Sequence, residues 1–257
     1  MNHATEVAAD GTQRAVKRAW VPEAPVAFEF NGLAYAVMMA TPTDLEDFCT
    51  GFVLGEGLAA RAGDISDIAV AEVELGWIVR ASLAGLGIEK LAERVRSRVA
   101  ESSCGLCGIE NLAAVAKPLP QVAAHAPIAP AAIFAALNAL RPLQVLGNAT
   151  GAAHAAAFCD SAGVVVCLRE DVGRHNAVDK LVGAMARARM PLTPGFVLST
   201  ARCSFEIVEK AVRGGATTLV CVSLPTSLAA GRAAAAGLSL WALAREDSVL
   251  LVGDASA

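Results

Sequence analysis

The sequence predicts an α/β protein in which a C-terminal α/β layer domain follows a smaller N-terminal α+β unit. From residue 163 onward, short apolar strands alternate regularly with helices, a pattern typical of a largely parallel sheet covered on both faces. Residues 19–117 lack that alternation and combine extended segments with isolated helices. With 257 residues, 55% of them hydrophobic, the chain is long enough for one large domain or two modest ones with a buried core.

Overall composition limits the function classes that fit. The formal net charge of −4 argues against a surface that binds nucleic acid. The nearest candidate for a membrane span, residues 214–231, is interrupted by Pro225 and by Ser and Thr residues, which argues against a membrane protein. Residues 1–18 carry charges of both signs and no apolar run, so we expect a mobile tail there and no targeting signal.

The N-terminal unit, residues 19–117, is predicted to begin with two strands. Alternating side chains over residues 25–37 favour a strand pair that turns at Asn31 and Gly32. A further extended stretch is expected over residues 68–81.

Two helices complete this unit. Thr43 and Glu46 have the spacing of a capping box and predict the start of the first helix. Residues 89–99 predict a charged, exposed helix that leads into a Ser-Ser-Cys segment. The buried face of the first helix would consist of Leu45, Phe48, Phe52 and Val53.

The C-terminal domain is predicted over residues 128–257, after a connector rich in proline. Pro130 opens an alanine-rich helix and Pro142 closes it. The expected strands are residues 164–168, 196–198, 217–222 and 238–243, and the expected helices are residues 177–189, 205–213 and 228–236. The second of these helices would expose a solvated face consisting of Glu206, Glu209, Lys210 and Arg213.

Polar side chains follow three of the predicted strands directly, at the carboxyl ends where open α/β sheets bind ligands. Arginines there add fixed positive charge, and the free N–H groups of helix starts favour anions, so these clusters suit phosphate groups. The candidate binding residues are Arg174, His175, Ser199, Arg202, Ser223, Thr226 and Ser227. Ordinary helix capping is the alternative, but capping accounts for one polar residue per helix and not for three clusters.

Several neighbouring polar residues have two interpretations. His175 fits either a base or phosphate donor, or a hydrogen-bonding residue at a helix start. His154 stands alone on an apolar stretch, which favours a structural histidine over a ligand. The carboxylates Glu170, Asp171 and Asp179 fit an acid/base set or, more commonly, ion pairs that orient arginines.

The chemical centre is expected at Cys104 and Cys107, two cysteines separated by two residues in a segment rich in Ser and Gly. Small neighbours leave both thiols accessible, and the spacing lets both sulfurs meet one electrophile, one metal ion or each other. The seven cysteines are odd in number and scattered, unlike a secreted disulfide framework, so we expect a cytoplasmic protein. Apolar surroundings predict buried thiols at Cys49, Cys159, Cys167 and Cys221.

The string from Arg169 to Leu181, REDVGRHNAVDKL, closely resembles the FdhD family, the sulfurtransferases needed to make active formate dehydrogenase. Further family motifs occur in the expected order, and the resemblance covers about residues 42–245. These motifs are Cys104 to Gly108, Thr150 to Ala155, Ser204 to Val208 with Lys210, and Val222 to Leu228.

This resemblance implies a cytidine-deaminase-like fold for the C-terminal domain and a homodimer. It also implies an activity, in which sulfur from a cysteine desulfurase passes to the molybdenum bis-guanine-dinucleotide cofactor before this cofactor enters formate dehydrogenase. By the same resemblance, Cys104 carries the sulfur as a persulfide and Cys107 assists. The cofactor, or GDP as its surrogate, would bind the C-terminal half, including Leu243, Ala244, Arg245, Glu246, Asp247 and Ser248.

The chain departs from the family pattern at two places. The family usually has an aromatic residue at the position of Leu243, and a Gly and an Arg near Asp247 and Ser248, so a stacking partner for the base and some charge contacts are missing here. Cys203 stands where small or aliphatic residues are usual.

Three other function classes remain open. A thioredoxin-like dithiol oxidoreductase also uses Cys-x-x-Cys, but there the pair follows a strand and opens a helix. A zinc site needs more ligands than this pair offers, and the zinc-deaminase pattern is absent from the sequence, so we expect no metal site. A non-catalytic chaperone for the molybdenum cofactor would keep the polar clusters and tolerate loss of both cysteines.

Overall fold

The computed structural model describes residues 2–99 and 117–253. Its C-terminal half contains a six-stranded sheet in the order β12-β11-β10-β9-β7-β8. The strands are β7 (His154–Cys159), β8 (Val165–Asp171), β9 (Phe196–Ser199), β10 (Thr218–Cys221), β11 (Ser239–Ala242) and β12 (Leu250–Gly253).

The direction of these strands brings several loops to one edge of the sheet. β9, β10 and β11 are parallel to one another. β7 is antiparallel to both β8 and β9, so β8 points the same way as β9. The prediction of a largely parallel sheet is therefore correct for β8 to β11, whereas the antiparallel β7 and β12 were missed. The small side chains of Ala155, Ala156 and Ala157 explain the omission of β7, because strands are usually marked by β-branched and aromatic residues.

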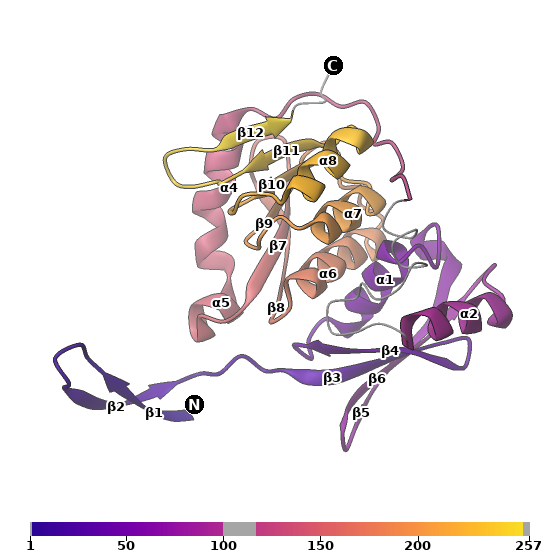
Figure 1. The fold of residues 1–257 in the computed structure, drawn as a ribbon, viewed down its shortest axis with the longest axis horizontal. Helices are drawn as coiled ribbons and strands as arrows, with labels where there is room; N and C mark the ends of the chain where they lie inside the picture. Colours follow the sequence, from indigo (N-terminus) through magenta and orange to yellow (C-terminus); the bar gives the residue numbers. More distant parts are fainter. Residues whose placement is uncertain (1, 100–116, 254–257) are drawn as a thin grey trace.

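Helices cover both faces of this sheet (Figure 1). One face carries α4 (Pro130–Leu143) and the short α5 (Val145–Thr150), and the other carries α6 (Arg174–Arg187), α7 (Phe205–Arg213) and α8 (Ser227–Ala236). Alternate side chains of β7 enter the two cores: Ala156 and Phe158 pack under α6 to α8, and Ala157 and Cys159 pack under α4. The C-terminal half is thus a three-layer α/β fold, as expected.

The N-terminal unit is a four-stranded sheet in the order β4-β3-β6-β5, with α1 (Leu45–Gly55) packed on one face. Its other elements are β3 (Ala24–Phe30), β4 (Leu33–Ala40), the 3-10 helix η1 (Ala62–Asp64), β5 (Ile65–Val73), β6 (Gly76–Leu83) and α2 (Ile88–Val99). The predicted turn is confirmed, because Asn31 and Gly32 both have positive φ. The predicted buried face of α1 is also confirmed, since Leu45, Phe48, Phe52 and Val53 are all buried.

Two local predictions in this unit were wrong. The N-cap of α1 is Asp44, which has φ 52° and no side-chain cap, so Thr43 and Glu46 do not form a capping box. The carboxylate of Asp44 is directed instead toward Arg169, 3.6 Å away. The extended stretch over residues 68–81 is two strands, because the chain turns at Glu74 and Leu75 between β5 and β6. Gly76, the first residue of β6, has φ 145°, and a Cβ atom there would lie 2.3 Å from the carbonyl oxygen of Pro25, so only glycine fits this position.

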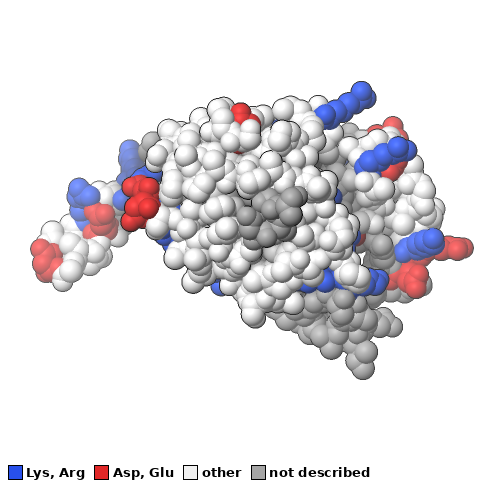
Figure 2. Space-filling model, turned by 90° about the horizontal axis from the view of Figure 1, so that it is seen from above, with Lys and Arg blue, Asp and Glu red and all other residues white. Residues whose placement is uncertain are grey.

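The first residues also differ from the expected tail. Asn2–Val7 (β1) and Gln13–Arg18 (β2) form an antiparallel hairpin that projects from the body of the molecule (Figure 1). Its turn is held by the side chain of Asp10, which accepts the N–H of Thr12 at 2.9 Å. Charges of both signs lie on this hairpin, and most of the face shown in Figure 2 is uncharged. Within residues 2–99 and 117–253, no helix combines the length and apolar character that crossing a bilayer requires.

Candidate functional site

The string from Arg169 to Leu181 is the most specific sequence feature, and many of its polar side chains join the two halves of the molecule. Asp171 and Lys180 form a fully buried ion pair at 2.6 Å. Asp171 also accepts the N–H of Thr41 at 3.0 Å, and Lys180 Nζ donates to the carbonyl of Thr41 at 2.9 Å. Asn176 Nδ2 donates to the carbonyl of Met39 at 2.9 Å. These residues therefore fix the end of β4 against the start of α6.

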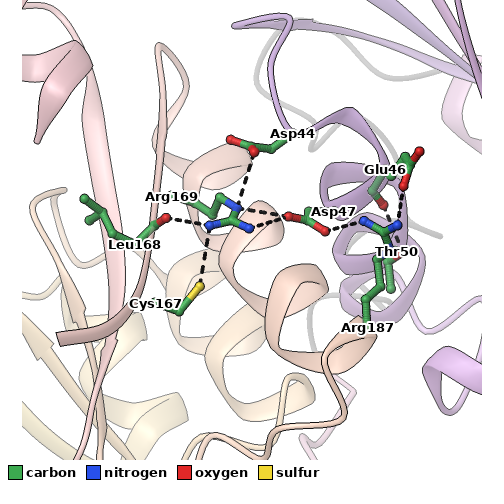
Figure 3. Close-up of polar contacts among 8 residues, drawn as sticks. All are labelled: Asp44, Glu46, Asp47, Thr50, Cys167, Leu168, Arg169 and Arg187. Carbon is green, nitrogen blue, oxygen red and sulfur yellow. Dashed lines mark hydrogen bonds and ion pairs between the residues drawn. The ribbon is translucent and has the colours of Figure 1, made fainter. Parts of the chain in front are cut away.

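Arg169 extends this junction to α1 (Figure 3). Its Nε and Nη2 atoms donate to Asp47 Oδ2 at 3.0 and 2.7 Å, and Arg187 Nη1 donates to Asp47 Oδ1 at 2.6 Å. Glu46 pairs with the same Arg187. The buried Asp47 is thus clamped between two arginines of the C-terminal half, and we call Asp47, Arg169 and Arg187 the ionic junction.

The remaining carboxylates of the string also hold structure together. Glu170 accepts the N–H groups of Leu146 and Gly147, both at 2.8 Å, and so fixes the start of α5. Asp179 pairs with Lys210 at 2.7 Å, and burial raises the pKa of Asp179 while the nearby ammonium group opposes that shift. These carboxylates are therefore structural, but among the described residues none of them orients an arginine: Asp171 and Asp179 pair with lysines, and Glu170 binds backbone N–H groups.

The prediction of a solvated face on α7 was wrong, because its charged side chains also hold elements together. Glu206, Glu209 and Lys210 are only partly exposed, and each forms an ion pair with another element of the C-terminal half. Arg213 is exposed, as predicted. Charge spacing along one helix indicates an outer face, but it does not show that partners on α6 and α8 cover that face.

Two residues of the string, Arg174 and His175, lie at the start of α6 and face the carboxyl edge of the sheet. The Nε atom of Arg174 is buried and has no hydrogen-bond partner within the described residues. His175 Nε2 lies 2.9 Å from Glu206 Oε2 and 3.5 Å from Ser204 Oγ. The hydrogen bond from His175 lowers the pKa of Glu206.

Two further side chains approach this point from neighbouring strands. Arg202, from the loop after β9, is exposed. His154 is the first residue of β7 and pairs in register with Asp171 of β8. Burial, followed by the charges of Arg174, His175 and Arg202, lowers the pKa of His154. We call His154, Arg174, His175 and Arg202 the cationic edge; sequence reasoning missed the place of His154 because it missed β7.

The other candidate residues have more ordinary environments. Ser199 is buried and its hydroxyl accepts the N–H of Ala201 at 3.2 Å, so its side chain does not face a ligand. Thr226 caps α8 by accepting the N–H of Ala229 at 3.1 Å, so the capping alternative holds there. Ser223 accepts the N–H of Leu243 through its carbonyl, and Ser227 is exposed on the first turn of α8.

A cavity of about 380 Å³ opens at the same edge, on the α4 side of the sheet. It combines an apolar floor with polar groups, and its lining includes Leu137, Leu140, Arg141, Gln144, Asn148, Thr200, Ala244, Arg245 and Glu246. Three members of the predicted cofactor segment, Ala244, Arg245 and Glu246, thus line the cavity. Leu243 is exposed beside it, and Asp247 and Ser248 lie exposed in the following turn.

The expected reactive cysteines, Cys104 and Cys107, lie outside the described residues. Of the other cysteines, Cys49, Cys159 and Cys221 are buried as predicted, whereas Cys167 is partly exposed. Cys203 is also buried, and a hydrogen bond between the two thiols lowers its pKa and raises that of Cys221. Cys203 is thus a core residue. Within residues 2–99 and 117–253, no three His, Cys, Asp or Glu residues are grouped as metal ligands would be.

Comparison with known proteins supports the resemblance noted from the motifs. The family model described as FdhD/NarQ matches residues 21–255. This chain belongs to the FdhD/NarQ family. It is 43% identical over 235 residues to the sulfur carrier protein FdhD of Variovorax paradoxus, covering 91% of this chain and 84% of that protein. It is 44% identical over 207 residues to the sulfur carrier protein FdhD of Bordetella petrii, covering 80% and 74%.

The fold of this FdhD/NarQ protein also matches a solved structure. A crystal structure described as that of a formate dehydrogenase accessory protein from Desulfotalea psychrophila aligns with a TM-score of 0.77. The alignment covers 98% of this chain and 96% of that one at 23% identity. The arrangement of the two halves is therefore that of a known fold.

Proposed function

We propose that this FdhD/NarQ protein is a sulfur carrier that acts in the maturation of formate dehydrogenase. The observation that supports this most is the identity of 43% over 91% of the chain to a protein named as a sulfur carrier. Cys104 and Cys107, in their Ser- and Gly-rich segment, supply the thiols that such a carrier needs.

In the proposed reaction, the Cys104 thiolate attacks the terminal sulfur of a persulfide on a cysteine desulfurase. One S–S bond breaks and another forms, so Cys104 becomes a persulfide and the desulfurase thiol is released. Release to the acceptor has two routes. In the first, Cys107 attacks the inner sulfur of the Cys104 persulfide, which oxidises the two cysteines to a disulfide and releases the outer sulfur as sulfide. In the second, Cys107 only shapes the segment, and an external thiol reductant makes the same attack, forming a mixed disulfide with Cys104 and releasing sulfide. The first route requires a thiol reductant to restore both cysteines.

The proposed sulfur acceptor is the molybdenum bis-guanine-dinucleotide cofactor, bound as substrate at the carboxyl edge. The cavity on the α4 side has an apolar floor with carboxylate, amide and guanidinium groups, which fits a purine base. The buried Nε of Arg174, which has no hydrogen-bond partner among the residues that the structure describes, and the nearby Arg202 fit the diphosphate. The proposal includes a cysteine desulfurase and formate dehydrogenase as partners, a cytoplasmic homodimer, and no stably bound metal of the protein's own.

The test is sulfur loading followed by activation of formate dehydrogenase. After incubation with a cysteine desulfurase and free cysteine, intact-mass analysis and peptide mapping should find one additional sulfur on Cys104, and reductant should remove it. Cys104→Ser should abolish loading and activation without unfolding the protein. Cys167→Ser, which changes a partly exposed cysteine on β8, serves as the matched control and should load normally.

Other outcomes favour the competing functions. A folded Cys104→Ser protein that activates the dehydrogenase normally contradicts the persulfide assignment. If the double variant at Cys104 and Cys107 also works, a non-catalytic cofactor chaperone is the better account. Catalytic disulfide exchange with a model substrate, without sulfur loading, would favour a dithiol oxidoreductase. One zinc per chain, lost in the double variant, would indicate a metal site.

A further inference from the structure

Positive charge gathers at the cationic edge with little to balance it. Arg174 and Arg202 have no ion-pair partner within the described residues, and the carboxylate of Glu206 is engaged by His175. Asp171 lies nearby, but Lys180 neutralises it at 2.6 Å. Like charges in a partly buried position repel each other, and an anion bound among them relieves that repulsion.

The side chain of His154 points into this group. Ala156 and Phe158, two and four residues further along β7, pack in the core under α6 to α8. Because side chains alternate along a strand, His154 lies on the same face, next to the start of α6. The cavity lies on the other face, where Ala153 is part of its lining. His154 is therefore placed beside the anion-binding groups and away from the proposed base site.

The loop that carries Arg202 is held beside the same residue. Thr200 of this loop donates its N–H to the carbonyl of Ala155 at 3.0 Å and accepts the N–H of Ala155 through its hydroxyl at 2.8 Å. These bonds fix the first turn after β9 against the start of β7. Arg202 follows two residues later, and its charge acts on His154.

We propose that His154 is a ligand-binding residue of the cationic edge and that it takes up a proton when the diphosphate of the substrate binds. This inference rests on the proposed function, and it assigns a role to a residue outside the predicted binding set. The proton comes from solvent and is held on the imidazole ring. The ring then donates a charge-assisted hydrogen bond to a phosphate oxygen.

The direction of the pH dependence follows from the charges that face His154. In the free protein, burial and the positive groups of Arg174, His175 and Arg202 lower its pKa, and Asp171 opposes them, so the ring is neutral at neutral pH. A bound diphosphate adds negative charge and raises the pKa. Between the two pKa values, binding takes up a proton and affinity rises as the pH falls; outside that window the dependence disappears.

The experiment uses GDP-mannose, whose diphosphate is a diester and lacks the terminal phosphate ionisation, near pH 6, of GDP itself. Calorimetric titration at about pH 7 in two buffers of different ionisation enthalpy should show uptake of a fraction of a proton by the wild type. The affinity should be about threefold to tenfold higher at about pH 6 than at about pH 8. His154→Gln should abolish both effects. His125→Gln is the matched control, because His125 contacts Ala123 and Ser239 instead, and it should behave as the wild type.

Several results would overturn the inference. Proton uptake that persists in His154→Gln excludes His154, and uptake lost only in His175→Gln assigns the proton to His175. Because the substitution itself can unfold the chain, the ring signal of His154 is also followed by NMR in the wild type, where its titration midpoint should rise on ligand addition; an unchanged midpoint rejects the role. Binding that is independent of pH overturns this inference alone, whereas absence of any guanine nucleotide binding overturns the proposed cofactor site as well.

Discussion

Gly51 of α1 and Gly183 of α6 each lie directly against a carbonyl group of the other helix. A Cβ atom on Gly51 would lie 1.7 Å from the carbonyl oxygen of Asp179, and one on Gly183 would lie 1.8 Å from that of Asp47. Each aspartate is one helical turn before the glycine of its own helix, so the contact is reciprocal. Such close approach of two helix backbones requires glycine on both sides. This contact lets the ionic junction reach across from α6 and β8 to α1.

A methyl group at this crossing should separate the two helices. We expect Gly183→Ala to lower the free energy of unfolding by about 3 kcal/mol, because the blocking atoms are backbone and cannot rotate away. Gly231→Ala is the matched control, since that glycine lies within α8 and a Cβ there meets nothing within 4 Å. The control should be stabilised by about 0.5 to 1 kcal/mol. Urea unfolding measures both, and equal stability of the two variants would contradict the importance of the crossing.

Most of the α/β architecture could be predicted from the sequence, because local signals marked it. Apolar runs located the parallel strands, and Asn31 with Gly32 located the hairpin turn. The predictions were wrong where contacts with distant residues decide the local structure. Asp44 starts α1 in a left-handed conformation beside Arg169 of a distant strand, and nothing near Asp44 in the sequence indicates that partner.

The candidate site was predictable to a smaller extent. The loops after β8, β9 and β10 meet at one edge as expected, because parallel strands end together. The role of each polar side chain was not predictable, since Ser199 turns into the core and Thr226 caps α8. His154 lies at the site because it begins the antiparallel β7. This strand was not predicted, because its alanine-rich sequence gives a weak strand signal.

The ionic junction provides a second test of how the two halves are held together. Asp47→Asn should lower the free energy of unfolding by about 2 to 3 kcal/mol, because the neutral amide leaves the partly buried Arg169 with only the more distant carboxylate of Asp44, 3.6 Å away, as a countercharge. Arg61→Gln, which breaks the exposed pair with Asp64, is the control, and its free energy of unfolding in urea should equal that of the wild type. If the free energy of unfolding of Asp47→Asn also equals that of the wild type, Asp47 only positions its arginines and contributes no net stability.

Acid should weaken the contact between α6 and α7. The hydrogen bond from His175 lowers the pKa of Glu206 below its usual value of 4.5, so this pair stabilises the fold above that value and is lost as the pH falls through the folded pKa. Glu206→Gln should therefore lose less stability than the wild type between about pH 5 and about pH 3. Urea midpoints across that range measure the difference. The same flattening is expected in His175→Gln, and an unchanged slope in both variants would show that the pair does not contribute.

The arginines of the cationic edge offer the most direct test of ligand binding. Arg174→Ala and Arg202→Ala should each weaken GDP binding about tenfold to a hundredfold, because a charge-assisted hydrogen bond contributes about 1.5 to 3 kcal/mol. Neither should unfold the protein, since Arg202 is exposed and the buried Nε of Arg174 makes no hydrogen bond within the described residues. Arg80→Ala, which removes a surface ion pair with Glu29 in the N-terminal sheet, should bind GDP normally. Calorimetric titration compares the three. Unchanged affinity in both edge variants would remove these arginines from the site and leave the α4 cavity as the place where the nucleotide binds.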